Sequence, residues 1–161
     1  MESLLSRLVA VHPQLNFIPG KTFCWSPKKR EIQYIPGVDN STAQYALLHE
    51  VGHALLNHKN YTGDFELLSM EVAAWEEAKR IAPDYDVDIN EDHIQDSLDS
   101  YRDWLYRRSV CPTCSTKSLQ QDGKPLYRCY NCHATWEVAT SRFCRPYRQA
   151  RPTDKATTTA T

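Results

Sequence analysis

The chain has 161 residues, of which 41% are hydrophobic and 24% are charged, as is typical of a soluble globular protein with one core domain and a small appendage. No apolar run is long enough to cross a membrane, and the N-terminal residues lack the basic start and apolar centre of a signal peptide, so we expect a cytoplasmic protein. Residues 109–161 carry eight Lys and Arg against three acidic residues, a charge of +5, whereas the remainder carries −6. The basic C-terminal part therefore either meets an anionic partner or keeps the protein soluble.

The N-terminal part predicts a short helix, a β-hairpin and a longer helix. Helical spacing of apolar residues predicts an amphipathic helix over residues 2–11, and its expected buried face holds Leu4, Leu5, Leu8 and Val11. Residues 22–25 and 31–35 are expected to form two strands joined by a polar turn at 26–30. A helix from about 42 to 58 follows. Its candidate N-terminal caps are Asp39, Asn40 and Ser41, the last in a capping box with Gln44.

The helix at 42–58 carries the pattern H-E-x-x-H, from His49 to His53, inside an apolar run. Two imidazoles four residues apart lie about 40° apart around a helix, so both can reach one metal ion. Glu50 is placed to act on a metal-bound water without being a ligand, which is the arrangement of a zinc metalloprotease. The alternative is two partly buried histidines with an incidental Glu50, a charge that is costly in an apolar stretch. We attribute Gly52 to the close approach of a neighbouring strand.

A catalytic zinc ion usually takes three protein ligands, so a third must come from elsewhere in the chain. The next predicted helix, about 65–81 with Asp64 as its cap, is the natural donor. Its acidic residues are Glu66, Glu71, Glu76 and Glu77. Glu71 is the best candidate, because it falls on the apolar side of the helix and opens the small-residue segment EVAAW. Glu76 and Glu77 lie beside basic residues and are typical of a solvated face.

The segments HEVGHALLNH and, 18 residues after His53, EVAAWEEAKRIAP resemble the small gluzincin-type peptidases of the ImmA/IrrE group. The resemblance covers roughly residues 20–83. It implies that His49, His53 and Glu71 are zinc ligands and that Glu50 is the general base. It further implies that the strand at 31–35 is an edge strand that could hold an extended substrate by strand addition. The chain departs from the group at Ala73, where members often carry a second acid.

Other candidates near this site are less well defined. His58 would lie about 140° around the helix from His53, pointing away from the metal, where it is explained by the helix dipole alone. A third long helix is predicted at 91–108, with Asn90 as its cap. The residues considered for stabilising the oxyanion are Tyr61, Tyr85 and His93.

Residues 109–138 form a separate cysteine module. Two C-x2-C pairs, 14 residues apart, provide four candidate ligands of a structural zinc ion: Cys111, Cys114, Cys129 and Cys132. A turn at Asp122-Gly123 and strands near 127–128 and 134–138 are typical of a zinc ribbon, in which the metal replaces a core that about thirty residues cannot build. His133 is not expected to be a ligand, and Cys24 and Cys144 are expected to be free thiols.

The module and the tail mix basic and aromatic residues. Contacts with nucleic acid are predicted for Lys117, Lys124, Arg128, Arg142 and Arg145. The nearby aromatic residues Tyr127, Tyr130 and Trp136 either stack on bases or cover the small core of the ribbon.

The sequence thus predicts an α+β fold: a zincin-like domain over 1–108, with a hairpin packed on the two metal-binding helices, a zinc ribbon over 109–138 and a basic, disordered tail over 139–161. The first functional hypothesis is an endopeptidase with one catalytic and one structural zinc ion, in which Glu50 assists a zinc-bound water in attacking a protein substrate, such as a DNA-bound repressor or regulator. The alternatives are a nucleic-acid-binding or regulatory protein on a peptidase-like body, and a SprT-like protease acting on DNA-bound proteins. SprT-like proteases take their third zinc ligand from a histidine.

Overall fold

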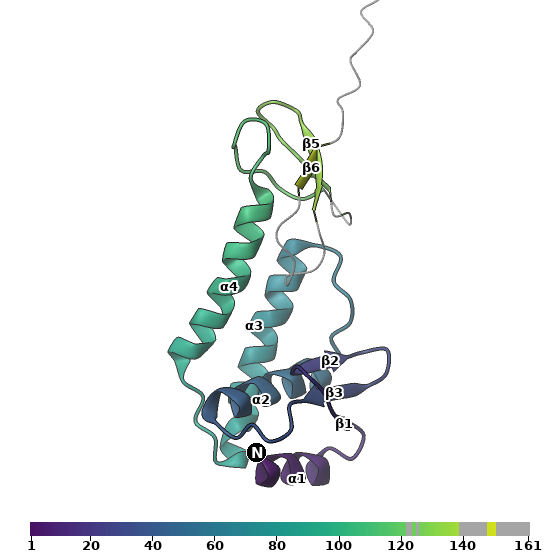
Figure 1. Ribbon diagram of the computed structural model, residues 1–161, viewed down its shortest axis with the longest axis vertical. Helices are drawn as coiled ribbons and strands as arrows, with labels where there is room; N and C mark the ends of the chain where they lie inside the picture. The colour runs from purple at the N-terminus through teal and green to yellow at the C-terminus, as the bar shows by residue number, and fades with distance from the viewer. Residues whose placement is uncertain (122–123, 125, 139–147, 151–161) are drawn as a thin grey trace, which may run out of the picture. The chain divides into compact units, whose positions relative to one another are not determined.

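Helices and small sheets alternate along the chain, which confirms the expected α+β class (Figure 1). The computed structural model describes residues 1–121, 124, 126–138 and 148–150. One compact unit comprises Met1–Tyr61 and Phe65–Leu98, and a second comprises Thr62–Asp64 with the described residues from Asp99 onward. The division falls inside a helix rather than at residue 109. Every helix in the described part of the chain is too short or too polar to span a lipid bilayer.

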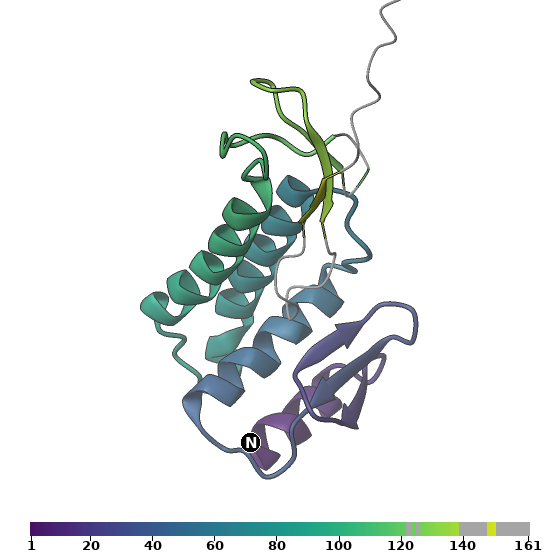
Figure 2. The same ribbon diagram turned by 45° about the horizontal axis from the view of Figure 1, so that its top comes forward.

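The first unit contains a three-stranded sheet between helices. In chain order its elements are α1 (Glu2–Val11), β1 (Asn16–Pro19), β2 (Cys24–Ser26), β3 (Glu31–Tyr34), α2 (Ser41–Leu55), α3 (Asp64–Ile81), the short 3-10 helix η1 (Ala82–Tyr85) and α4 (Glu91–Ser109). Helices α3 and α4 contribute residues to both units. The hairpin of β2 and β3 is confirmed. Helix α2 packs on these two strands, and Figure 2 shows the sheet on one side of α2 and α3 on the other.

The sheet has the order β1-β3-β2, with β1 parallel to β3 and β2 antiparallel to it. Ile32 at the centre is paired with Phe17 of β1 and with Trp25 of β2. The expectation that residues 31–35 form an edge strand is therefore wrong, because the unpredicted strand β1 covers that side. The outer strand of the hairpin is β2, which pairs with no other strand among the described residues.

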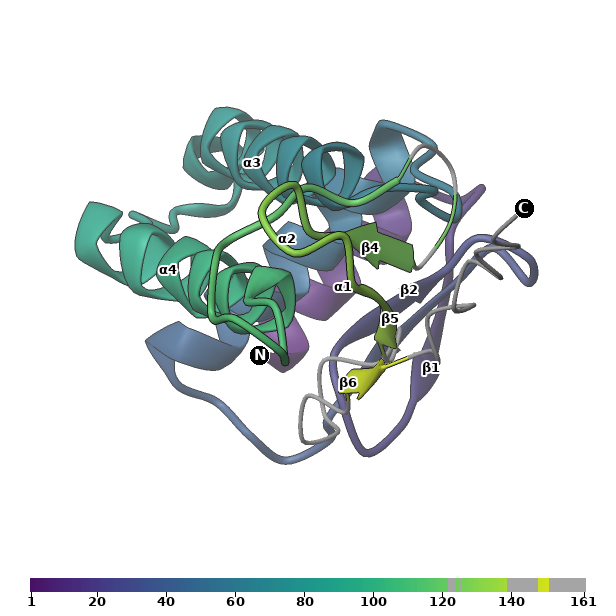
Figure 3. The same ribbon diagram turned by 90° about the horizontal axis from the view of Figure 1, so that it is seen from above.

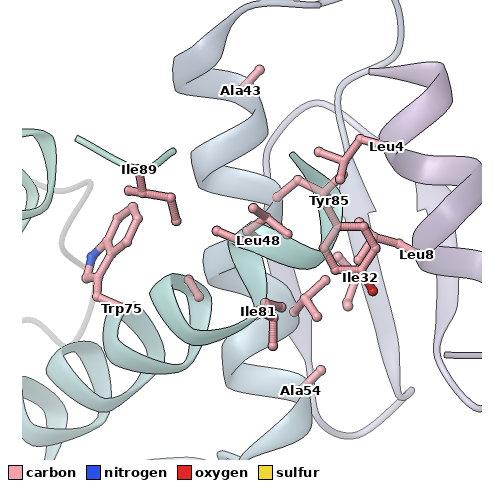
Figure 4. Close-up of a cluster of buried hydrophobic side chains, with 14 of the residues drawn as sticks. Leu4, Leu8, Ile32, Ala43, Leu48, Ala54, Trp75, Ile81, Tyr85 and Ile89 are labelled. Atoms are coloured by element: carbon pink, nitrogen blue, oxygen red, sulfur yellow. The ribbon is translucent and has the colours of Figure 1, made fainter. Parts of the chain in front are cut away.

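The core of the first unit lies between α1, the sheet, α2 and the end of α3 (Figure 4). Leu8, Ile32 and Leu48 are fully buried there, and burying each such side chain stabilises the fold by roughly 1.5–3 kcal/mol. Val11 was expected on the buried face of α1 but is 62% exposed, because it is the last residue of that helix. None of the residues discussed below as metal donors belongs to this cluster.

Side-chain caps fix where two helices begin. The Oδ1 atom of Asn40 accepts a hydrogen bond from the Ala43 amide at 2.8 Å, so Asn40, rather than Ser41, caps α2. Asn90 caps α4 as predicted, because its Oδ1 atom accepts from the Asp92 amide at 2.7 Å. Asp64 is the first residue of α3, and its carboxylate accepts a hydrogen bond from the Tyr127 hydroxyl.

The second unit contains an antiparallel sheet of β4 (Leu126–Arg128), β5 (Thr135–Val138) and β6 (Arg148–Ala150), in that order (Figure 3). The two strands predicted for the cysteine module are confirmed. Strand β6 lies in the tail that was expected to be disordered; the remainder of that tail, Cys144 included, lies outside the described residues, as does the predicted turn at Asp122-Gly123.

Candidate metal centres

Three donor side chains from two helices meet in the first unit. The Nε2 atoms of His49 and His53, on α2, lie 3.1 Å apart. In Glu71, on α3, the Oε2 atom lies 3.2 Å from His49 Nε2 and the Oε1 atom lies 3.6 Å from His53 Nε2. All three residues are buried, with 5–8% of their surface exposed. The structure thus brings together the three ligands predicted from the sequence, in a group that could hold a metal ion.

The spacing and charge of this group fit a metal ion. Tetrahedral zinc with bonds of about 2.0–2.1 Å places its ligand atoms about 3.3 Å apart, close to the separations between these donors. Burial raises the pKa of Glu71, but hydrogen bonds with His49 and His53 outweigh it and hold that pKa well below its usual range. The group therefore offers a buried negative charge and two imidazole nitrogens to a cation.

The donors meet because α2 and α3 approach each other very closely. A Cβ atom built on Gly52 would lie 2.4 Å from the main-chain oxygen of Ala74, a distance that no side chain tolerates. Gly52, one residue before His53, is therefore required by helix α3, and the expectation of a neighbouring strand is wrong. The close approach falls at the buried residue Ala74, within the small-residue segment EVAAW that was expected to allow close packing.

Glu50 follows His49 in the chain and contacts the sheet. Its Oε2 atom accepts a hydrogen bond from the main-chain N–H of Trp25, in β2, at 2.7 Å. That N–H bonds to a helix side chain, so it points away from β3, toward the outer edge of the sheet. Glu50, the residue after His49, is thus anchored to β2 and is not one of the three donors.

His58 comes back toward the site, contrary to the prediction that it points away. Helix α2 ends at Leu55, three residues earlier than expected, and Asn57 takes a left-handed conformation with φ of 53°. This turn brings the Nδ1 atom of His58 to 2.8 Å from the Nδ1 atom of His53. Burial, and then the neighbouring His53, lower the pKa of His58. A helix that continues to residue 58 cannot make this contact, so helical periodicity alone missed it.

Trp75 packs against His49, and His93 packs against Trp75. Trp75 lies against the His49 ring, with centroids 4.3 Å apart, and the His93 ring meets Trp75 edge-on at 5.7 Å. Trp75 therefore lies between His93 and the ligand. Tyr85 does not reach the site: its hydroxyl lies 3.1 Å from His12 Nε2, and its ring packs in the core near Leu8 (Figure 4). Tyr85 is thus a wrong candidate for the oxyanion.

The four predicted cysteines form a second donor group. The sulfurs of Cys111 and Cys132 lie 3.6 Å apart, and those of Cys114 and Cys129 lie 3.4 Å apart. These separations far exceed a disulfide bond of about 2.05 Å and approach the roughly 3.8 Å expected between sulfurs around one zinc ion. The group could hold a metal ion. Cys24, by contrast, is a free thiol on β2, as predicted.

The environment of these sulfurs favours binding of a cation. Hydrogen bonding with Thr116 lowers the pKa of Cys114 to about 5. A main-chain hydrogen bond from Ala134 lowers the pKa of Cys132, but desolvation and the three neighbouring sulfurs outweigh it and raise that pKa. Four thiolates in one place repel one another, so a cation is needed for all four to ionise.

The two cysteine pairs are made by the same turn, used twice. Ser115 and His133, the residues that follow each pair, have φ of 61° and 60°. Each donates its amide to the first cysteine's carbonyl, Ser115 to Cys111 and His133 to Cys129, at 3.0 Å in both cases. The amide of each first cysteine in turn bonds to a carbonyl two residues beyond the pair. His133 therefore has a backbone role and is absent from the donor group, as expected.

The residues considered for nucleic-acid binding lie in different surroundings. The Lys117 ammonium lies 4.1 Å from the centre of the Tyr106 ring. Lys124 and Arg128 are exposed, and Arg142 and Arg145 lie outside the described residues. Tyr127 and Trp136 are buried and stacked, with centroids 5.4 Å apart. They therefore cover the small core rather than stand ready for bases, and only Tyr130, of the three aromatic residues considered, is exposed.

Comparison of the chain with models of protein families, with curated proteins and with solved structures finds no match.

Proposed function

We propose that this chain is a zinc-dependent endopeptidase with a zincin-like first unit and a zinc ribbon in its second. The observation that carries the proposal is the convergence of His49, His53 and Glu71, with Glu50 fixed beside them by the edge strand. Three protein donors leave a coordination position for water, which is typical of a catalytic zinc site, whereas four cysteines close the shell of a structural one. A carboxylate as third donor supports a gluzincin-type site over a SprT-like one.

A zinc ion bound by the three donors would act as a Lewis acid and lower the pKa of a bound water. Glu50 would accept the proton of the attacking water and deliver it to the leaving amine. The hydrogen bond from the Trp25 N–H to Glu50 Oε2 holds this carboxylate in place and leaves its other oxygen for the proton.

The contact of Glu50 with the edge strand β2 supports an extended peptide as the substrate. An extended substrate lying along β2 would run past Trp25, and hence past Glu50, so its scissile bond would come close to the general base. Because the Trp25 N–H is already bonded to Glu50, the substrate would not pair with β2 at that residue. The resemblance to the ImmA/IrrE group makes a DNA-bound repressor or regulator the first substrate to test.

The proposal is tested with the zinc-loaded full chain and an unfolded protein substrate, whose fragments are identified by mass spectrometry. Glu50→Gln should reduce hydrolysis at least about 100-fold, because it removes the proton acceptor, while zinc content stays the same. Glu76→Gln makes the same change at an exposed position of α3 and should have no effect. Undiminished hydrolysis by Glu50→Gln, or none by the native chain on any of several substrates, would overturn the proposal.

A further inference from the structure

His53 differs from His49 in having a partner for its second ring nitrogen. The Nε2 atom of His53 faces His49 and Glu71, so a metal ion would bind there. Its Nδ1 atom faces His58 Nδ1 at 2.8 Å, a hydrogen-bond distance. By contrast, His49 Nδ1 is buried and has no hydrogen-bond partner among the described residues. The orientation of His53 is thus specified by a second side chain, whereas His49 is held by packing against Trp75.

The chemistry of the contact assigns the protons. A neutral imidazole has one N–H and one lone pair, so a His53 that gives its Nε2 lone pair to a metal carries its proton on Nδ1. His53 must then donate to His58, and His58 Nδ1 must accept. His58 Nδ1 must therefore carry a lone pair, so the proton of a neutral His58 lies on Nε2.

The acceptor is itself held in place by the edge strand. The indole N–H of Trp25 donates a hydrogen bond to the main-chain oxygen of His58 at 2.9 Å, and the amide of His58 donates to the carbonyl of His53 at 3.0 Å. These two bonds fix the backbone of residue 58 beside the end of α2. Trp25 thereby contacts both Glu50, through its main chain, and His58, through its side chain.

We propose that His58 is a positioning residue for the metal ligand His53, and that the Trp25 indole holds His58 in the accepting position. The inference rests on the proposed function in that it requires a metal ion at His49, His53 and Glu71. Partners of this kind orient the ligand ring and raise its basicity, and losing one typically weakens metal binding about 10- to 100-fold.

The test is zinc affinity, measured on the full chain by competition with a chromogenic chelator. His53→Ala first identifies which bound zinc belongs to the histidine–glutamate group, that is, to His49, His53 and Glu71. His58→Leu, which removes the acceptor, should weaken that zinc about 10- to 100-fold and leave the cysteine-bound zinc unchanged. His58→Asn should restore most of the affinity, because its amide oxygen can stand where Nδ1 stands. Trp25→Phe, which removes the indole N–H together with part of the ring, should weaken the same zinc to a smaller extent.

The matched control is His12→Leu, which removes a histidine hydrogen-bonded to Tyr85 outside the site and should leave both zinc affinities unchanged. Equal affinities of His58→Leu and the native chain would overturn the inference, as would a His58→Asn variant no better than His58→Leu. Should His58→Leu fail to fold, the inference is decided by the other two variants: near-native zinc affinity of His58→Asn with weakened affinity of Trp25→Phe supports it, and unchanged affinity of Trp25→Phe overturns it. If His53→Ala loses no zinc, the proposed metal site itself fails, which separates that outcome from failure of the positioning role alone.

Discussion

The histidine–glutamate group draws its donors from two helices, whereas the cysteine group draws them from two copies of one short turn. The first group needs α2 and α3 to approach at Gly52 and Ala74, and it lies beside a hydrophobic core to which its donors contribute nothing. In the second group the cysteines are themselves part of a small core around Tyr127 and Trp136. In the first unit the donors are thus positioned by a core that does not include them, whereas in the second unit the donors belong to the core.

The largest effect should follow from breaking the cysteine group. Cys129→Ser, or removal of metal by a chelator, should unfold the ribbon, because structural zinc contributes about 10–16 kcal/mol of apparent binding free energy to such small modules. Two-dimensional NMR would then show collapsed signals for residues 110–138 and preserved signals for the first unit. Cys24→Ser is the control, since Cys24 is outside the donor group. A well-dispersed ribbon spectrum in the Cys129→Ser variant would show that its fold needs no metal.

The next effect concerns metal content without unfolding. Glu71→Gln replaces the charged donor by an amide, so metal per chain should fall from two ions to about one, measured by atomic absorption after dialysis. The first unit should stay folded by circular dichroism, because Leu8, Ile32 and Leu48 pack without Glu71. Glu76→Gln should retain two ions. Loss of the first unit's fold in Glu71→Gln would contradict the distinction between the two groups.

The parts that the sequence predicted correctly depend on short-range spacing. The H-E-x-x-H and C-x2-C patterns predicted which residues meet, because helical geometry and the reach of a tight turn are local properties. Glu71 was found by combining apolar periodicity with the small residues around it. The hairpin followed from two apolar runs separated by a polar turn.

The parts that were missed depend on where elements stop and on what lies beside them. His58 reaches His53 only because α2 ends at Leu55, and helix ends are not fixed by periodicity. Strand β1 holds only two apolar residues, and its parallel pairing with β3 is a long-range contact. A glycine in a helix signals a close neighbour, but the sequence does not say whether that neighbour is a strand or, as here, the backbone at Ala74.

Adding one methyl group at Gly52 tests how far the first group depends on helix packing. Gly52→Ala should destabilise the first unit by about 1–3 kcal/mol in urea unfolding, since relieving the clash with the Ala74 oxygen moves α3 away from α2. The same shift should separate Glu71 from the histidines and weaken that metal alone. Gly63→Ala is the matched control, because its nearest outside atom is 3.8 Å from the new methyl group. Unchanged stability and metal affinity in Gly52→Ala would mean that the donors tolerate a wider helix spacing.

The smallest effect separates the stability of α2 from the placement of its donors. Asn40→Ala removes the side chain that accepts from the Ala43 amide and should lower the free energy of unfolding by about 1 kcal/mol. Ser41→Ala removes only the capping box expected from the sequence and should change it by less than about 0.5 kcal/mol. Both variants should bind metal as the native chain does, because the cap lies more than two helical turns before His49. An effect of Ser41→Ala larger than that of Asn40→Ala would reverse the assignment of the cap. A metal affinity that falls with Asn40→Ala would instead mean that the donor positions depend on the whole helix and not chiefly on its contact with α3 at Gly52.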